Sequence, residues 1–180
     1  MNLAVPASAY LYGPLTRLGL IAAALACAAD QASKLWLLYG FDLANRGIVR
    51  LTPFLDFVLT WNTGISYGLF PQESDFGRYL LLLLKFAAIV VLWVWLARAE
   101  SRLTALSLGL IVGGALGNAI DRLAHGAVVD FVLFHITTAT VNFNWYVFNL
   151  ADAAIVAGVA GLLYESFWGA GAPQKRPDPP

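Results

Sequence analysis

Four long apolar stretches divide the chain, and each is close to the length that a membrane-spanning helix requires. They cover residues 18–38, 79–97, 103–120 and 145–164. A helix needs about 20 mostly apolar residues to cross a bilayer, and in lipid every backbone polar group must find a partner within the protein. We therefore predict four transmembrane helices in a single membrane domain over residues 1–168, with no internal repeat.

The segments between and after these stretches differ in pattern. Within residues 39–78, apolar and polar positions alternate at Ile48–Thr52 and Phe57–Asn62, which predicts short strands at the membrane surface. Residues 121–144 are the second long connection, and we expect a loop there. Residues 169–180 contain four prolines, which predicts a disordered tail.

Basic residues indicate how the chain is oriented. An even number of spans places both ends and the turn at residues 98–102 on one face. That face carries five basic residues, and the other carries four: Arg17, Arg98, Arg102, Lys175 and Arg176 against Arg46, Arg50, Arg78 and Arg122. Because basic residues are enriched in cytoplasmic connections, this difference favours cytoplasmic ends.

The composition agrees with a protein dissolved in lipid. Hydrophobic residues make up 59% of the chain and charged residues only 12%, whereas a soluble domain is about half apolar and about a quarter charged. The formal net charge is zero, so no basic surface for nucleic acid is implied. The single cysteine, Cys27, excludes an internal disulfide. It follows Arg17 and an apolar run, as a lipid-accepting cysteine does, but the run continues past it for a full span.

Polar residues interrupt the first apolar stretch and follow it in the first long connection. Asp30 and Lys34 are four residues apart and so share one helix face. They form a structural ion pair, contact a substrate, or do both, because charged groups inside a membrane are expensive and are often functional. Asn62, Thr63 and Gly64 are ordinary turn residues, although an asparagine can also orient a peptide backbone.

The end of the third apolar stretch combines small and polar residues. The small residues of the segment Gly113–Arg122 favour close helix packing. Asn118, Asp121 and Arg122 lie three and four residues apart, and packing alone does not explain a polar face at the end of a helix.

Asp130 and Asp152 are each flanked by apolar residues near the outer boundary of the membrane. Two carboxylates brought together there cannot easily both ionise, so one keeps a proton. Such a pair can activate a water and protonate a leaving group. The alternative is two independent carboxylates, with Asp152 serving as a charge at a helix N-terminus.

Other kinds of site have less support. His125 and His135 are ten residues apart and no HExxH segment is present, so a zinc site is not expected. A dyad of Ser66 with Lys85 is conceivable, but no local pattern supports it.

A transporter is the main alternative to an enzyme, since intramembrane charges such as Lys85 can line an ion path. A transport path requires polar groups that reach both faces of the membrane. Most intramembrane polar groups of this chain lie toward the outer half, which disfavours a transporter. A structural membrane subunit is a third alternative, but it gives two isolated carboxylates no use.

Five segments in this order resemble the motifs of the bacterial lipoprotein signal peptidase family, also called signal peptidase II. The resemblance extends over about residues 15–165, and the segments are Asp30–Lys34, Asn62–Gly64, Gly113–Arg122, Val128–Phe131 and Phe148–Asp152. Each motif alone is weak, but five in order on a chain with four apolar stretches are specific. The sequence departs from the family at residues 65–67, where alanine and phenylalanine are common.

The resemblance implies an all-α membrane protein with four transmembrane helices and a small extracytoplasmic β-like cradle. It implies an aspartic endopeptidase of the bacterial inner membrane, with its active site toward the extracytoplasmic side. The substrates would be prolipoproteins, cleaved before a diacylglyceryl-modified cysteine among membrane lipids, and the inhibitor would be globomycin. No cofactor or metal is expected because water is the nucleophile. By the same resemblance Asp130 and Asp152 are catalytic, and the substrate-binding residues are Asp30, Lys34, Asn62, Gly64, Asn118, Asp121, Arg122 and Asn149.

Overall fold

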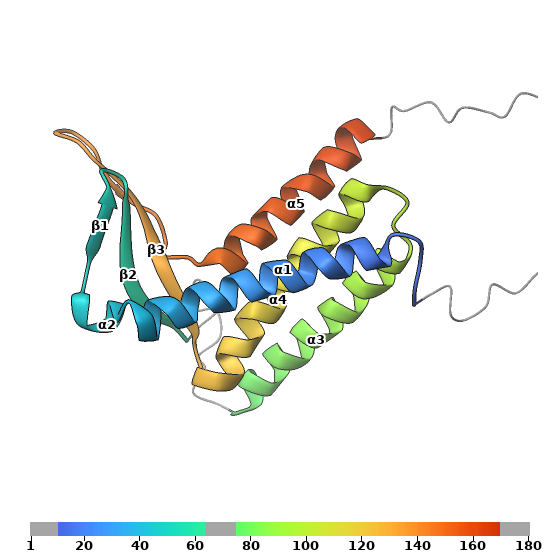
Figure 1. Ribbon diagram of the computed structural model, residues 1–180, viewed down its shortest axis with the longest axis horizontal. Coiled ribbons are helices and arrows are strands. Elements are labelled where there is room, and N and C mark those ends of the chain that lie inside the picture. Colours follow the sequence, from blue (N-terminus) through green and yellow to red (C-terminus); the bar gives the residue numbers. More distant parts are fainter. Residues whose placement is uncertain (1–10, 64–74, 170–180) are drawn as a thin grey trace, which may run out of the picture.

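The computed structural model describes residues 11–63 and 75–169 and consists of a helical bundle with a small sheet at one end (Figure 1). The long helices are α1 (Thr16–Leu35), α3 (Asp75–Ala97), α4 (Arg102–His125) and α5 (Leu150–Trp168). A π-helical turn, η2 (Trp36–Gly40), continues α1, and a short helix, α2 (Leu43–Arg46), follows it. The strands are β1 (Val49–Thr52), β2 (Leu55–Asn62), β3 (Val128–Thr137) and β4 (Asn142–Asn144).

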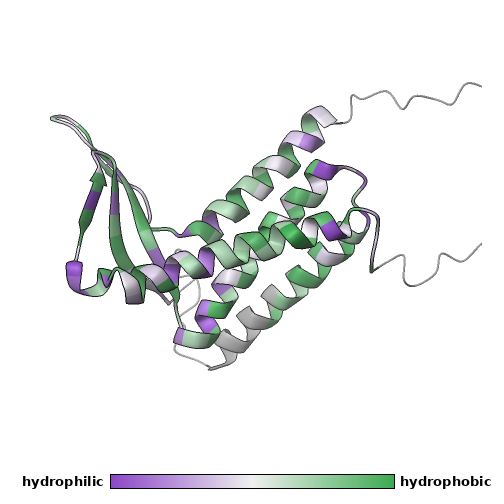
Figure 2. Cartoon of the chain, viewed as in Figure 1, coloured by the Kyte–Doolittle hydropathy of each residue, from purple (hydrophilic) through white to green (hydrophobic). Residues whose placement is uncertain are grey.

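Three helical stretches among the described residues are long and apolar enough to cross a membrane. They are Thr16–Gly40, Arg102–His125 and Leu150–Trp168. Apolar residues dominate the middle of these helices, and hydrophilic positions gather toward their ends (Figure 2). The protein is therefore membrane-embedded. Of α3, the stretch Phe86–Ala97 is apolar but shorter than a span, and the side chain of Lys85 lies outside the described structure.

Helix α4 is the centre of the bundle and packs against α1, α3 and α5. Glycines allow this close approach. A Cβ at Gly109 would collide with the backbone oxygen of Gly19, and a Cβ at Gly113 would collide with that of Ala23. At the end of the bundle remote from the sheet, α1, α3, α4 and α5 share a core around the buried Leu96 and Leu108. The helices are thus held by small residues at short range, as expected where lipid offers no hydrophobic drive for association.

The sheet is antiparallel throughout, in the order β1-β2-β3-β4. Its apolar residues pack against η2 and α2: Phe131 of β3 forms a buried cluster with Leu37 of η2 and Leu43 of α2, and Phe41 and Phe57 extend it. The alternating patterns correctly indicated the first two strands. The expectation of a loop over 121–144 was wrong, because α4 continues to His125 and most of the rest forms β3 and β4.

Two caps explain where the helices differ from the predicted ranges. Helix α4 extends past Asp121 and Arg122 and ends at Gly126, whose φ of 75° suits a residue without Cβ. Helix α5 begins at Leu150 instead of residue 145, because Asn149 caps it with its side chain and Phe148 hydrogen-bonds to β3. Three predictions lie outside the described residues: the tail at residues 169–180 except Gly169, the role of Gly64, and the departing positions at 65–67.

Replacing Ala23 by leucine tests the packing of α1 on α4. Ala23 is buried, and its backbone lies where the Cβ of a residue at position 113 would be. We expect Ala23→Leu to destabilise the protein by about 1–3 kcal/mol, the usual cost of overpacking. Ala24→Leu adds the same atoms to the adjacent, exposed position and should change stability by less than about 0.5 kcal/mol. Thermal melts in detergent measure both, and equal losses would contradict this packing.

Candidate active site

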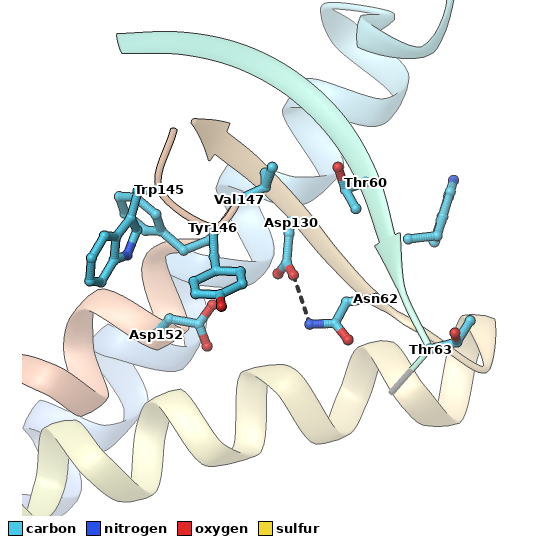
Figure 3. A pocket seen from close by; sticks show the side chains of 10 residues that line it. Thr60, Asn62, Thr63, Asp130, Trp145, Tyr146, Val147 and Asp152 are labelled. Carbon is cyan, nitrogen blue, oxygen red and sulfur yellow. Dashed lines mark hydrogen bonds between the residues drawn. The ribbon is translucent and has the colours of Figure 1, made fainter. Parts of the chain in front are cut away.

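Asp130 and Asp152 face one pocket of about 820 Å³ where the sheet meets the helices (Figure 3). Asp130 comes from β3, and Asp152 comes from the first turn of α5. The side chain of Asn62, at the end of β2, points toward Asp130 from the neighbouring strand. The pocket is lined by polar residues and by an aromatic group, namely Thr60, Trp61, Asn62, Thr63, Asp130, Trp145, Tyr146, Val147, Phe148 and Asp152.

Strand register places Asn62 beside Asp130. Thr60 is opposite Asp130 and Asn62 is opposite Val128 in the antiparallel pair of β2 and β3. Side chains two residues apart on a strand share a face, so Asn62 and Asp130 are diagonal neighbours on the same face of the sheet. The Nδ2 of Asn62 donates a hydrogen bond of 3.0 Å to Oδ2 of Asp130.

The N-terminus of α5 orients Asp152. Asn149 and Asp152 form a reciprocal cap: Oδ1 of Asn149 accepts from the backbone N–H of Asp152 at 3.0 Å, and Oδ2 of Asp152 accepts from the backbone N–H of Asn149 at 3.2 Å. Oδ1 of Asp30, from α1, accepts from the backbone N–H of Ala151 at 2.9 Å. These bonds satisfy amides that a helix terminus otherwise leaves without partners. They also hold the Asp152 carboxylate at the positive end of the helix dipole.

Two asparagine amides connect the two carboxyl groups. Nδ2 of Asn149 donates to Oδ1 of Asp130 at 2.6 Å and to Oδ1 of Asn118 at 3.1 Å. Nδ2 of Asn118 in turn donates to Oδ1 of Asp152 at 2.9 Å. Asn149 therefore bonds to Asp130 through its side chain and to Asp152 through its backbone. The two carboxyl groups belong to one hydrogen-bonded network.

Behind the pocket, Lys34 holds this network in place. Its Nζ lies 2.7 Å from Oδ2 of Asp30 and 2.7 Å from Oδ2 of Asp121, and it donates to Oδ1 of Asn118 at 3.2 Å. An ammonium has three N–H donors, and these three partners use all of them. The Lys34, Asp30 and Asp121 side chains are all buried. Oδ2 of Asp121 also accepts from the backbone N–H of Val129 at 3.0 Å, which fixes the strand one residue before Asp130.

Arg122 follows Asp121 on α4 and is half-buried. The negative charges of Asp130, Asp152 and Asp121 act on its guanidinium. Arginine stays protonated in proteins, so it supplies a permanent positive charge near the two carboxyl groups. That charge can offset the negative charge of the pocket or attract an oxygen of a ligand.

Burial raises the pKa of Asp130 above its ordinary value. The hydrogen bond from Asn62 lowers the pKa, and the negative charge of Asp152 raises it further. Asp130 therefore retains a proton to a higher pH than an exposed aspartate does. The two carboxyl groups thus have different environments, since Asp130 is desolvated on a strand and Asp152 sits at a helix N-terminus.

The structure brings together most of the residues that the sequence singled out. Asn62, Asp130 and Asp152 line the pocket, while Asn118 and Asn149 connect the carboxyl groups. Asp30, Lys34 and Asp121 are not on the pocket wall and have protein partners. The shared helix face of Asp30 and Lys34 is confirmed by their ion pair.

The sequence did not single out two other features of the site. Gln31 joins Asp30 to Asp121, although it lies inside the first motif. Thr60 lines the pocket because it is opposite Asp130 across the sheet, and only the register reveals this.

The two histidines lie apart from each other: His125 packs against Trp61, and His135 lies 3.2 Å from Asp56. Over residues 11–63 and 75–169, no three His, Cys, Asp or Glu side chains are grouped to hold a metal ion.

Comparison with known proteins identifies the family of the chain. The family model for "Signal peptidase (SPase) II" matches residues 22–168. The chain is 62% identical to a lipoprotein signal peptidase of Nitrobacter hamburgensis, over 84% of this chain and 92% of that one. It is 59% identical to one of Rhodopseudomonas palustris, over 87% and 95%. A solved structure titled as a bacterial membrane enzyme shares the fold, with a TM-score of 0.69 at 21% identity over 84% of this chain and 94% of that one. The chain therefore belongs to the signal peptidase II family of peptidases.

Proposed function

We propose that this chain is an aspartic endopeptidase that removes the signal peptide from prolipoproteins by cleaving before a diacylglyceryl-modified cysteine. Relatives that are 62% and 59% identical to it over the aligned residues are named lipoprotein signal peptidases. The observation that carries the catalytic type is the pair of carboxyl groups, Asp130 and Asp152, that face one pocket and are connected through Asn149.

In this proposal the two carboxyl groups have different roles. Asp152 is the ionised base, because the helix N-terminus and the amide donors of Asn118 and Asn149 favour its negative charge. Asp130 carries the proton, because burial disfavours its charged form. Asp152 removes a proton from water as the water oxygen attacks the peptide carbonyl, and Asp130 gives its proton to the carbonyl oxygen. The proton taken by Asp152 then passes to the leaving nitrogen as the C–N bond breaks, and Asp130 takes back a proton from one hydroxyl of the intermediate, which becomes the carboxylic acid product.

We also propose that α3 crosses the membrane, which gives four spans. Its 23 residues are enough, since a helix rises about 1.5 Å per residue and the hydrocarbon core is about 30 Å thick. The first and last described residues and the turn between α3 and α4 lie at the end of the bundle away from the sheet (Figure 1). Arg17, Arg98 and Arg102 belong to that end, which favours its being cytoplasmic. The sheet and the pocket then lie on the extracytoplasmic side of the inner membrane.

A pocket at the membrane boundary suits a lipid-modified substrate. The acyl chains can remain in the bilayer while the peptide bond enters between the sheet and α5. Trp145 and Tyr146 are exposed beside the pocket, and such side chains favour the interface between lipid and water. We expect globomycin to occupy the same pocket and to compete with the substrate.

The polar residues around the pair hold it or the substrate. Asn62, Asn118 and Asn149 are amides that do not titrate, so they position groups and do not transfer protons. We assign Arg122 to charge compensation or to a substrate oxygen, and Gly64 to the peptide-binding loop. Asp30, Lys34 and Asp121 act from behind the pocket by fixing Asn118, the start of α5 and the start of β3.

Replacing either carboxyl group by its amide tests the proposed chemistry. We expect Asp130→Asn and Asp152→Asn to reduce cleavage of a diacylglyceryl-modified prolipoprotein by at least about 10²–10⁴-fold, because an amide cannot exchange the required proton. Release of the signal peptide by purified protein in detergent measures this. Asp56→Asn is the matched control, since Asp56 is a buried carboxylate of β2 that does not line the pocket. A folded pair variant with near-normal turnover would remove that residue from the mechanism.

The pH dependence of turnover tests which residue carries the proton. We expect kcat to fall at acidic pH as the pair gains a second proton and at alkaline pH as it loses the first. The hydrogen bond from Asn62 lowers the pKa of Asp130, so its removal in Asn62→Ala should raise that pKa. The alkaline limb should therefore move to higher pH in the variant. An alkaline limb that moves to lower pH would contradict the assignment of the proton to Asp130.

A further inference from the structure

Gln31 directly follows Asp30 on α1, and the nitrogen of its side-chain amide contacts three acceptors. Nε2 lies 2.8 Å from Oδ1 of Asp121, 3.1 Å from the backbone oxygen of Gly117 and 3.2 Å from Oδ2 of Asp30. An amide nitrogen has two hydrogens, so these acceptors share them. Two of the three contacts reach from α1 to α4.

The same two carboxylates hold Lys34, so the four side chains form a closed ring. Lys34 contacts Oδ2 of both Asp30 and Asp121, and Gln31 contacts Oδ2 of Asp30 and Oδ1 of Asp121. Two carboxylates around one ammonium leave an excess negative charge in a buried site. Donors to both carboxylates reduce their repulsion, and an unpaired charge there would be costly.

Lys34 is one of two donors that orient the amide of Asn118. Oδ1 of Asn118 accepts from Lys34 and from Nδ2 of Asn149, and these bonds direct Nδ2 of Asn118 toward Oδ1 of Asp152. A shift of the ammonium would therefore be transmitted through one amide to the carboxylate. Gln31 does not line the pocket, so any effect that it has on the reaction passes through these residues.

We infer that Gln31 is a positioning residue for the peptidase reaction: by bridging Asp30 and Asp121 it fixes Lys34, and through Lys34 and Asn118 it orients Asp152. This inference rests on the proposed function. A positioning role can be distinguished from a role in helix packing alone. For packing alone, the hydrogen bond from Gln31 to the backbone oxygen of Gly117 on α4 is sufficient. A packing role gives a loss of stability, whereas a positioning role gives a loss of kcat with KM nearly unchanged, because Gln31 does not line the pocket.

Two substitutions of similar length distinguish these roles. Gln31→Met removes the donor and keeps an unbranched chain. Gln31→Glu replaces the donor by a carboxylate beside two others, and this carboxylate can donate only when it is protonated. Ser33→Ala is the matched control, because Ser33 lies on the same helix turn and its hydroxyl bonds to the backbone oxygen of Asp30 and not to the ring.

The readout is kcat for cleavage of the diacylglyceryl-modified prolipoprotein, measured across pH together with thermal melts. We expect Gln31→Met to lower kcat by about tenfold or more at every pH, since small displacements of catalytic groups can cost about 10²-fold. Gln31→Glu should match Gln31→Met at alkaline pH and approach the unmodified protein as the pH falls. Ser33→Ala should retain nearly full turnover.

Two results would overturn the positioning role. One is a folded Gln31→Met protein with unchanged kcat. The other is a kcat of Gln31→Glu that is lower than that of the unmodified protein by the same factor at every pH. This second result is obtained without Gln31→Met, so it does not depend on whether that variant folds. Failure of the proposed function gives a different result. The unmodified protein would then cleave no prolipoprotein, or the Asp130→Asn variant would cleave it as fast as the unmodified protein does.

Discussion

A buried ammonium is the constraint on which the rest of the site depends. Lys34 is inaccessible to water within a membrane protein, where an unpaired charge costs several kcal/mol. Its three donors must therefore find three acceptors, and these are Asp30 on its own helix and Asp121 and Asn118 on α4. This requirement fixes how α1 and α4 lie against each other. Gly117 permits it, since a Cβ there would come within 2.5 Å of Oδ2 of Asp30.

From this centre, each bond leads toward the pocket. Asp30 reaches the first turn of α5, Asp121 reaches the start of β3, and Asn118 reaches Asp152. Two elements that are distant in the sequence, β3 and α5, are thereby joined to one cluster on α1 and α4. The two carboxyl groups arrive in different surroundings, one desolvated on a strand and one at a helix N-terminus. That difference is what a pair needs if one member is to hold a proton while the other accepts one.

The sequence predicted the features that depend on local spacing. The four-residue interval placed Asp30 and Lys34 on one helix face, and alternation at Phe57–Asn62 indicated a strand. It could not predict that Asp130 lies on a strand, because the pairing of β3 with β2 involves residues almost 70 positions away, with a bulge between Phe57 and Thr60. The start of α5 was also missed. An apolar run does not show that Asn149 will act as a cap and that the preceding residues will pair with β3.

A double-mutant cycle on kcat tests whether Lys34 acts on the carboxyl pair through Asn118. The four proteins are the unmodified chain, Lys34→Met, Asn118→Ala and the double variant, compared at saturating prolipoprotein and at a temperature where melts show all four folded. If Lys34 acts through Asn118, Lys34→Met should slow turnover strongly in the unmodified chain and change it little once Asn118 is already alanine. Equal fold losses in both backgrounds would show that the two residues act independently and that Lys34 does not orient Asp152 through Asn118.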